Sequence, residues 1–438
     1  MDDDLSEIRA LVEAGDVSEV VRRLRFSAEE LPLTEVARLA GWAATETGFE
    51  DLADASARVV ADPLDPKALF DFGYACIERG VSALAVPVFR EVLRLAPASS
   101  LVLGELVTAL EDEGRHGEAV EVLERHEATL HDWPDRYLLV YNSIMSGDLE
   151  RAGRNYARLS EPDDPRWLPA WARGGRMLAR AESARRVAPL DWQDLRGWHF
   201  TLTGGVLGTL SPYGFVTSMN GRYAYLQDDI GGCLRGLLRL RLIIDAAGLR
   251  PRTVSLLPDR SSRILGLAAA EVLGVPAEPF TPDRPDTVVV AYSLDEVDGD
   301  VLADLWNRVP GQVLYEHATC WTDPPALSAD VSTLLRQHGA SPWGGKRMWF
   351  KTDGSPAQIS LEDAWFEMDG FSPADRPAED VAAEIVRADP TPDPGDGETP
   401  ADPDEGLAAF VAGIRDRWLD GPRERVRASG PVLSFRFA

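Results

Sequence analysis

The five residues from Pro258 to Ser262, Pro-Asp-Arg-Ser-Ser, have the types expected of a small anion-binding loop. They follow an apolar stretch typical of a buried strand and precede a stretch typical of a helix. A serine at the helix N-cap leaves backbone N–H groups directed at an anion, and an arginine adds positive charge. We therefore take Asp259, Arg260, Ser261 and Ser262 as candidate anion-binding residues. The alternative, an ordinary N-cap in a strand-to-helix turn, stays open.

Polar residues also follow the next two apolar stretches. Ser293, Asp295 and Glu296 come after the second stretch, and His317 lies near the end of the third. Ligands of parallel sheets bind beyond the carboxyl ends of the strands, so these four residues are secondary candidates, with Asp295 or Glu296 as a ligand or base.

Other chemical signals are weak. The three cysteines, Cys76, Cys233 and Cys320, are far apart and none belongs to a CxxC pair, so neither a disulfide framework nor a structural metal site is expected. His199, His317 and His338 have no spacing typical of metal ligands. GxSxG, GxGxxG and Walker A patterns are absent, and the sequence indicates no cofactor and names no catalytic residue.

The candidate residues belong to a predicted α/β domain at 197–387. Strands are expected at 253–258, 287–294 and 312–319, and helices at 235–248, 261–274, 301–309 and 325–338. Residues 197–210 and 221–226, rich in glycine, aromatic and β-branched residues, are expected to form strands and turns. This alternation predicts a mostly parallel sheet with helices on both faces.

Residues 200–320 resemble the core of a type I phosphoribosyltransferase. The resemblance rests on the strand, the Pro-Asp-Arg-Ser-Ser loop, the helix, and the Leu-Gly-Val-Pro sequence before the next strand; the Ser-Pro-Tyr at 211–213 is similar to the entry segment of the orotate members. It implies a site for a phosphorylated or nucleotide-like small molecule. The family's paired acids are replaced by Ala291 and Tyr292, and its Thr- and Gly-rich phosphate loop is missing. We therefore expect a domain that has lost phosphoribosyl transfer.

A glycine recurs through residues 1–160 with spacings of 33, 32, 34 and 33. The glycines are Gly15, Gly48, Gly80, Gly114 and Gly147. Small or apolar residues follow each of them in one register, which predicts five helical hairpins stacked in a solenoid.

The third copy resembles the tetratricopeptide (TPR) repeat. The matching positions there and in the next copy are Leu69, Phe72, Gly73, Gly80, Ala85, Phe89, Pro97, Gly114 and Ala119. The resemblance implies a concave surface that binds a protein or peptide. A packing platform for the rest of the chain is the alternative.

Three further segments complete the predicted organisation. Residues 161–196 are rich in Trp and Arg and are expected to form a capping helical segment with internally paired arginines. Residues 388–406 are acidic and proline-rich, which predicts a disordered linker. Residues 407–438 begin with an amphipathic helix, for which docking on the α/β domain, in the solenoid groove or on a partner are the alternatives.

The formal net charge of −27 disfavours nucleic acids and anionic membranes as partners. The acidic N-terminus and the lack of a long apolar run indicate a cytoplasmic protein. The sequence thus predicts an interaction scaffold or regulator that binds a partner protein through its solenoid, with a non-catalytic α/β domain. An enzyme or binding protein for a phosphorylated small molecule is the alternative.

Overall fold

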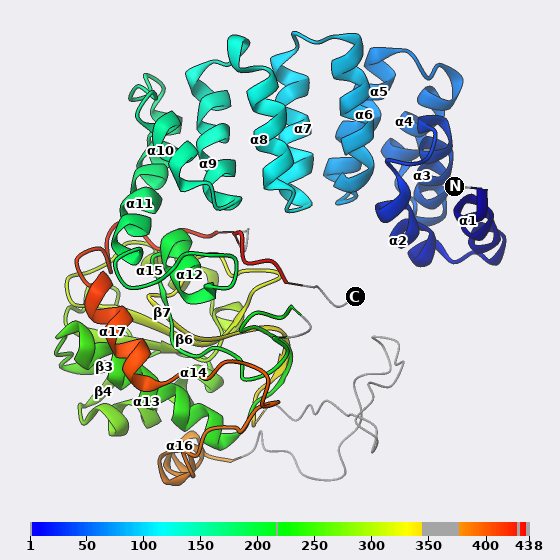
Figure 1. Cartoon of the computed structure of the whole chain (residues 1–438). Helices are drawn as coiled ribbons and strands as arrows, with labels where there is room; N and C mark the ends of the chain where they lie inside the picture. Colours follow the sequence, from blue (N-terminus) through cyan, green and yellow to red (C-terminus); the bar gives the residue numbers. More distant parts are fainter. Residues whose placement is uncertain (1, 216–217, 344–375, 427–429, 435–438) are drawn as a thin grey trace. The chain divides into compact units, whose positions relative to one another are not determined.

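A computed structural model describes residues 2–215, 218–343, 376–426 and 430–434. The chain divides into two compact units, 1–174 and 175–438, so the boundary falls inside the predicted connecting segment. The first unit is helical and the second is built on a parallel sheet with helices, which confirms the predicted α plus α/β fold class (Figure 1). No helix within these ranges combines the length and the apolar character required to span a bilayer.

Helices fill the first unit, and neighbours in the sequence pack on one another. They are α1 (Asp2–Ala14), α2 (Val17–Ser27), α3 (Leu33–Thr47), α4 (Glu50–Ala61), α5 (Pro66–Glu78), α6 (Ser82–Leu95), α7 (Ser100–Asp112), α8 (His116–Arg125), α9 (Tyr137–Met145) and α10 (Leu149–Tyr156). The five recurring glycines each separate an odd-numbered helix from the following even-numbered one, with φ between 68° and 87°. An L-residue with a side chain is strained at this φ, which explains the glycine period.

The residues of the third copy form the contact between α5 and α6. Leu69 and Phe72 of α5 and Phe89 of α6 are fully buried. Gly73 lies against the Phe89 ring so closely that a Cβ atom built on it is 2.8 Å from the ring Cζ. Ala85 and Ala119 are likewise fully buried in α6 and α8, and Pro97 follows the end of α6.

The second unit contains a sheet of seven strands in its described part, and every strand pair is parallel. The order is β1-β7-β6-β5-β3-β4, and β2 also pairs with β7. The strands are β1 (Val206–Leu207), β2 (Tyr223–Gln227), β3 (Thr253–Leu256), β4 (Ala277–Pro279), β5 (Thr287–Ala291), β6 (Val313–Cys320) and β7 (Val331–Ala340).

The helices of this unit connect and cover the strands. They are α12 (Leu195–Thr203), α13 (Ile230–Ala247), α14 (Arg260–Leu273), α15 (Gly299–Leu305), α16 (Ala378–Arg387) and α17 (Asp404–Ile414), while α11 (Leu168–Ala184) leads into the unit. Every residue of β5 and β6 is buried. Since alternate residues of a strand face opposite sides, both faces of the central sheet are covered.

Two predicted elements are wrong. The helix expected at 325–338 is largely the strand β7, because Val331–Ala340 pairs with β6 on one side and with β1 and β2 on the other, and this sheet pairing overrides a helix-like apolar spacing. The strand-like residues 197–203 belong to α12. Asp194 accepts a hydrogen bond from Gly197 N, and Gly204 ends the helix at φ 78°, so both caps favour a helix.

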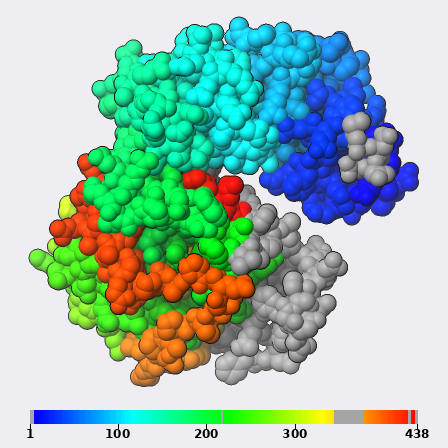
Figure 2. Space-filling model, in the orientation of Figure 1, coloured from blue at the N-terminus to red at the C-terminus, as the bar shows by residue number. Residues whose placement is uncertain are grey.

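The acidic segment before α17 has specific partners on the second unit. Asp402 pairs with Arg196 at 2.8 Å and with Arg239 at 2.5 Å, and Asp396 accepts a hydrogen bond from Gly214 N. Charge pairing thus replaces the apolar burial that this composition lacks. The apolar face of α17, including Leu407 and Val411, is buried and packs on α13. This segment and α17, orange in Figure 2, lie along the surface of the second unit.

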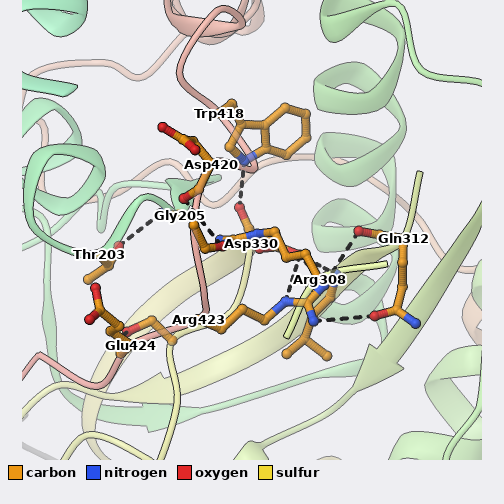
Figure 3. Close-up of polar contacts among 12 residues, drawn as sticks. Thr203, Gly205, Arg308, Gln312, Asp330, Trp418, Asp420, Arg423 and Glu424 are labelled. Atoms are coloured by element: carbon orange, nitrogen blue, oxygen red, sulfur yellow. Dashed lines mark hydrogen bonds and ion pairs between the residues drawn. The ribbon is translucent and has the colours of Figure 1, made fainter. Parts of the chain in front are cut away.

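Arg423 enters the core of the second unit from the C-terminal segment. Its guanidinium donates to Asp330 Oδ2 from Nε and Nη2 at 2.9 and 2.8 Å, and both side chains are fully buried (Figure 3). Nη1 donates to the Leu305 carbonyl and to Gln312. Burial alone raises the pKa of Asp330, but Arg423 and Arg308 outweigh it, and the pKa lies below its ordinary value.

We expect Gly73→Ala to destabilise the first unit by about 1–3 kcal/mol, because the new methyl group clashes with Phe89. The gain in helix propensity offsets at most about 1 kcal/mol. Gly104→Ala in α7, where nothing lies within 4 Å of the added Cβ, is the matched control and should be neutral or stabilising. Urea denaturation measures the free energy of unfolding of the two variants. Equal changes in Gly73→Ala and Gly104→Ala would contradict the close packing of Gly73 on Phe89.

Arg423→Met should destabilise the second unit by about 3–5 kcal/mol, because it leaves the Asp330 carboxylate buried without its main partner. Arg425→Ala removes an exposed pair with Asp323 and should cost less than about 1 kcal/mol.

Because the pKa of Asp330 is lowered in the folded state, the stability that it contributes is present above its unfolded pKa and is lost as pH falls through the folded value. Urea denaturation at pH 7 and at acidic pH tests both the mutational and the pH prediction. The difference in free energy of unfolding between wild type and Arg423→Met should be smaller at acidic pH than at pH 7.

Candidate functional site

A cavity of about 70 Å³ lies in the second unit beside α12, the end of β6 and β7. A buried water requires roughly 10–15 Å³, so the cavity has room for several non-hydrogen atoms. Apolar side chains make most of its wall: Leu195, Leu202, Trp321, Pro324, Pro325 and Leu335. Two nitrogen-bearing side chains, Arg222 and His199, also line it.

Arg222 is fully buried, at 1% exposure, and lies over the Trp321 ring at 5.2 Å from its centroid. Nη2 donates to the Val432 carbonyl at 2.8 Å, while Nε and Nη1 have no hydrogen-bond partner within the described ranges. Burial lowers the pKa of Arg222 to about 9, so the guanidinium stays charged at neutral pH. An uncompensated buried charge costs several kcal/mol, which makes this side chain a candidate for contact with an anion.

His199 supplies a third unsatisfied nitrogen to the cavity. Its Nε2 atom is buried and has no hydrogen-bond partner in the part of the chain that the structure describes. Burial, and then the charge of Arg222, lower the pKa of His199 to about 4. The imidazole is therefore neutral at pH 7 and adds a hydrogen-bonding group without adding charge.

The polar floor of the cavity comes from Thr319 and Ser332. The Thr319 hydroxyl is 2.6 Å from Glu316 Oε2, and Leu294 N donates to Glu316 Oε1 at 2.8 Å. Burial raises the pKa of Glu316 to about 7. The carboxyl group is thus partly protonated at neutral pH, and its remaining negative charge disfavours a ligand with two charges.

The candidate anion loop is closed by its own side chains. Asp259, rather than Ser261 or Ser262, is the N-cap of α14, and its Oδ1 accepts a hydrogen bond from Ser262 N at 2.8 Å. The Ser262 hydroxyl accepts from Tyr292 N, and Trp343 donates to the Ser261 hydroxyl. Arg260 donates to the Arg376 carbonyl. A carboxylate therefore occupies the place where an anion would bind, and the anion-binding role of this loop stays a prediction.

The secondary candidates divide between two clusters. Ser293 and Asp295 contact Arg336 of β7, with Arg336 Nη2 3.2 Å from the Ser293 hydroxyl and 3.5 Å from the Asp295 carboxylate. Glu296 is exposed. His317 lies within β6 rather than in the following loop, and its Nε2 is 3.0 Å from Asp228 Oδ2. The four residues do not form one site.

Sequence reasoning missed Arg222. Its neighbours in the sequence are ordinary, and only the fold places it beside Trp321 with two nitrogens that have no hydrogen-bond partner among the described residues. His199 was considered only as a metal ligand. The available signal was the high density of aromatic and glycine residues at 197–226, which marks a region of close backbone packing.

No family model matches this chain, and no curated protein matches it significantly.

Proposed function

We propose that the second unit binds a small carboxylic acid in the cavity beside α12, with the carboxylate on Arg222 and the apolar body against Trp321 and Leu202. The observation that carries this proposal is the buried Arg222 guanidinium, which has two nitrogens without a hydrogen-bond partner among the described residues and a pKa that burial lowers. A bound carboxylate supplies both the missing acceptors and the missing charge.

Charge and size both favour a compact monoanion. Arg222 is the charged nitrogen group of the cavity, His199 is neutral because its pKa is about 4, and Glu316 lies behind Thr319. One positive charge balances one carboxylate, whereas a phosphate dianion leaves an excess negative charge in a buried site. The volume of about 70 Å³ fits an acid with a short aliphatic chain or a single ring.

Propionate, butyrate and benzoate should therefore raise the melting temperature of the protein. At tenfold excess over Kd, the expected rise is about 3–6 °C for a unit of this size. Differential scanning fluorimetry at pH 7 measures this shift, and phosphate and an uncharged amide of each acid serve as comparison ligands. The affinity should fall modestly between pH 6 and 8, where Glu316, whose pKa is about 7, gains its negative charge, and more steeply above about pH 9, where Arg222 loses its proton, because its pKa is about 9.

Arg222→Met should abolish the shift without lowering the stability of the free protein, since it replaces an uncompensated buried charge by an apolar side chain of similar length. Arg263→Met, which removes an exposed arginine paired with Glu379, should retain the shift. The proposal is wrong if no acid stabilises the wild type, or if Arg222→Met responds as the wild type does.

The first unit supports a second function, the binding of a protein partner. A groove of about 540 Å³ is lined by apolar residues, including Leu31, Leu93 and Val122, and by Arg94 and Arg125. Both arginines are exposed and, among the described residues, form ion pairs with Glu91 and Glu121 of their own helices. Such local exposed pairs contribute a few tenths of a kcal/mol and are readily exchanged. An acidic peptide with apolar residues is the partner that this groove suits, in line with the scaffold role expected from the repeat.

Charge reversal at the groove should remove such a partner. Arg94→Glu combined with Arg125→Glu is expected to lose a protein that the full-length wild type retains from an extract of the source cells, with an unchanged melting temperature. Arg166→Glu, at an exposed arginine outside the groove, is the control and should retain it. Identical capture by all three proteins would contradict binding at this groove.

A further inference from the structure

Asp228, Cys233 and His317 bring three different metal-ligating atoms together inside the second unit. Each residue comes from a separate element: Asp228 follows β2, Cys233 is in the first turn of α13, and His317 is in β6. One ligand atom from each lies within 4.8 Å of the others, and all three residues are buried. None of them lines the cavity that holds Arg222.

The distances resemble those of a tetrahedral zinc centre. Asp228 Oδ2 is 3.0 Å from His317 Nε2 and 3.4 Å from Cys233 Sγ. Bond lengths of about 2.1 Å to oxygen and nitrogen and 2.3 Å to sulfur give tetrahedral edges of about 3.4 and 3.6 Å. A movement of a few tenths of an ångström therefore opens the cluster around an ion.

The surroundings of His317 orient its ring as those of a metal ligand do. Nδ1 is 3.1 Å from the Tyr315 hydroxyl, which in turn accepts a hydrogen bond from Thr333 at 2.7 Å. A hydrogen bond at the nitrogen that does not bind the metal fixes the tautomer of a ligating histidine. Gly236 of α13 makes room for this ring, because a Cβ atom at that position would be 2.7 Å from Nδ1.

Tyr292 adds a fourth polar group beside the cluster. Its hydroxyl donates to Asp228 Oδ2 at 3.0 Å, and its ring lies 5.4 Å from the imidazole, measured between centroids. The same carboxylate oxygen thus faces the histidine, the tyrosine hydroxyl and the thiol. The imidazole, the phenol and the thiol all converge on this one Asp228 oxygen. A divalent cation bound between the four groups would instead form a separate bond to each of them.

We propose that Asp228, Cys233, His317 and Tyr292 bind a zinc ion that fastens α13 to β6. On binding, the zinc–sulfur bond forms as the S–H bond of Cys233 breaks, and the proton leaves to solvent. Tyr292 binds through a lone pair of its hydroxyl oxygen and keeps its proton, while the ring proton of His317 resides on Nδ1 and is donated to Tyr315. The ligand set of nitrogen, oxygen and thiolate sulfur suits zinc, and its complete burial is typical of a closed structural site.

Metal content tests the proposal on the full-length protein. Because the site is buried, protein is refolded from denaturant with excess zinc chloride, dialysed against metal-free buffer and analysed by elemental mass spectrometry. About one zinc per chain is expected. Refolding with cobalt chloride should give a thiolate-to-cobalt charge-transfer band in the near ultraviolet, together with the visible bands of tetrahedral cobalt.

Cys233→Ser should lose the charge-transfer band and most of the metal, while Cys320→Ser, at another buried cysteine of the same unit, should keep both. If Cys233→Ser does not fold, the wild-type cobalt spectrum alone decides the matter. Arg222→Met should keep the metal, so failure of the anion proposal and failure of the zinc proposal are distinguishable. Refolded wild type that holds no zinc and shows no cobalt–thiolate band would overturn the assignment.

Discussion

The second unit depends on the buried ion pair between Asp330 and Arg423. Asp330 immediately precedes β7, the strand that joins β6 to β1 and β2, and its Oδ2 also accepts a hydrogen bond from Leu314 N of β6. Arg423 brings the C-terminal segment to this point, and Trp418 donates to the Asp330 carbonyl at 3.1 Å. A buried ion pair adds little net stability over apolar packing of the same volume. Removal of one partner is nevertheless strongly destabilising, because it leaves the other charge buried and unpaired. It therefore specifies where the C-terminal segment lies.

The position of that segment in turn shapes the cavity beside α12. Val426 lines the cavity, and the Val432 carbonyl accepts the hydrogen bond of Arg222 Nη2. Residues that are distant in the sequence thus complete a site whose other walls come from α12 and β7. The acidic segment before α17 contributes to the same arrangement, because Asp402 binds Arg196 of α12 at 2.8 Å. Electrostatic pairing, rather than apolar burial alone, holds α12 beside the sheet.

Local signals were sufficient for the helical unit and for half of the sheet. The glycine period reflects a φ near 70° at each turn, a constraint that acts within a few residues and is therefore visible in the sequence. The strands β3, β5 and β6 are short apolar runs between turn residues, and they were predicted within three residues at either end. β7 was not, because its strand conformation comes from neighbours on both sides. Arg222 could not be singled out for a similar reason: it differs from the other arginines only in what surrounds it.

The contrast between two buried arginines carries the functional argument. Arg423 and Arg222 are exposed by no more than 1% of their surface. Arg423 is offset by Asp330 and fills its other donors with Leu305 and Gln312 oxygens. Arg222 donates one hydrogen bond, to the Val432 carbonyl, and lies over the face of the Trp321 ring. Both guanidinium groups incur a similar desolvation penalty, and Arg423 recovers it within the fold, while two nitrogens of Arg222 have no hydrogen-bond partner among the described residues. The anion that we propose for the adjoining cavity, which Arg222 itself lines, compensates for this difference.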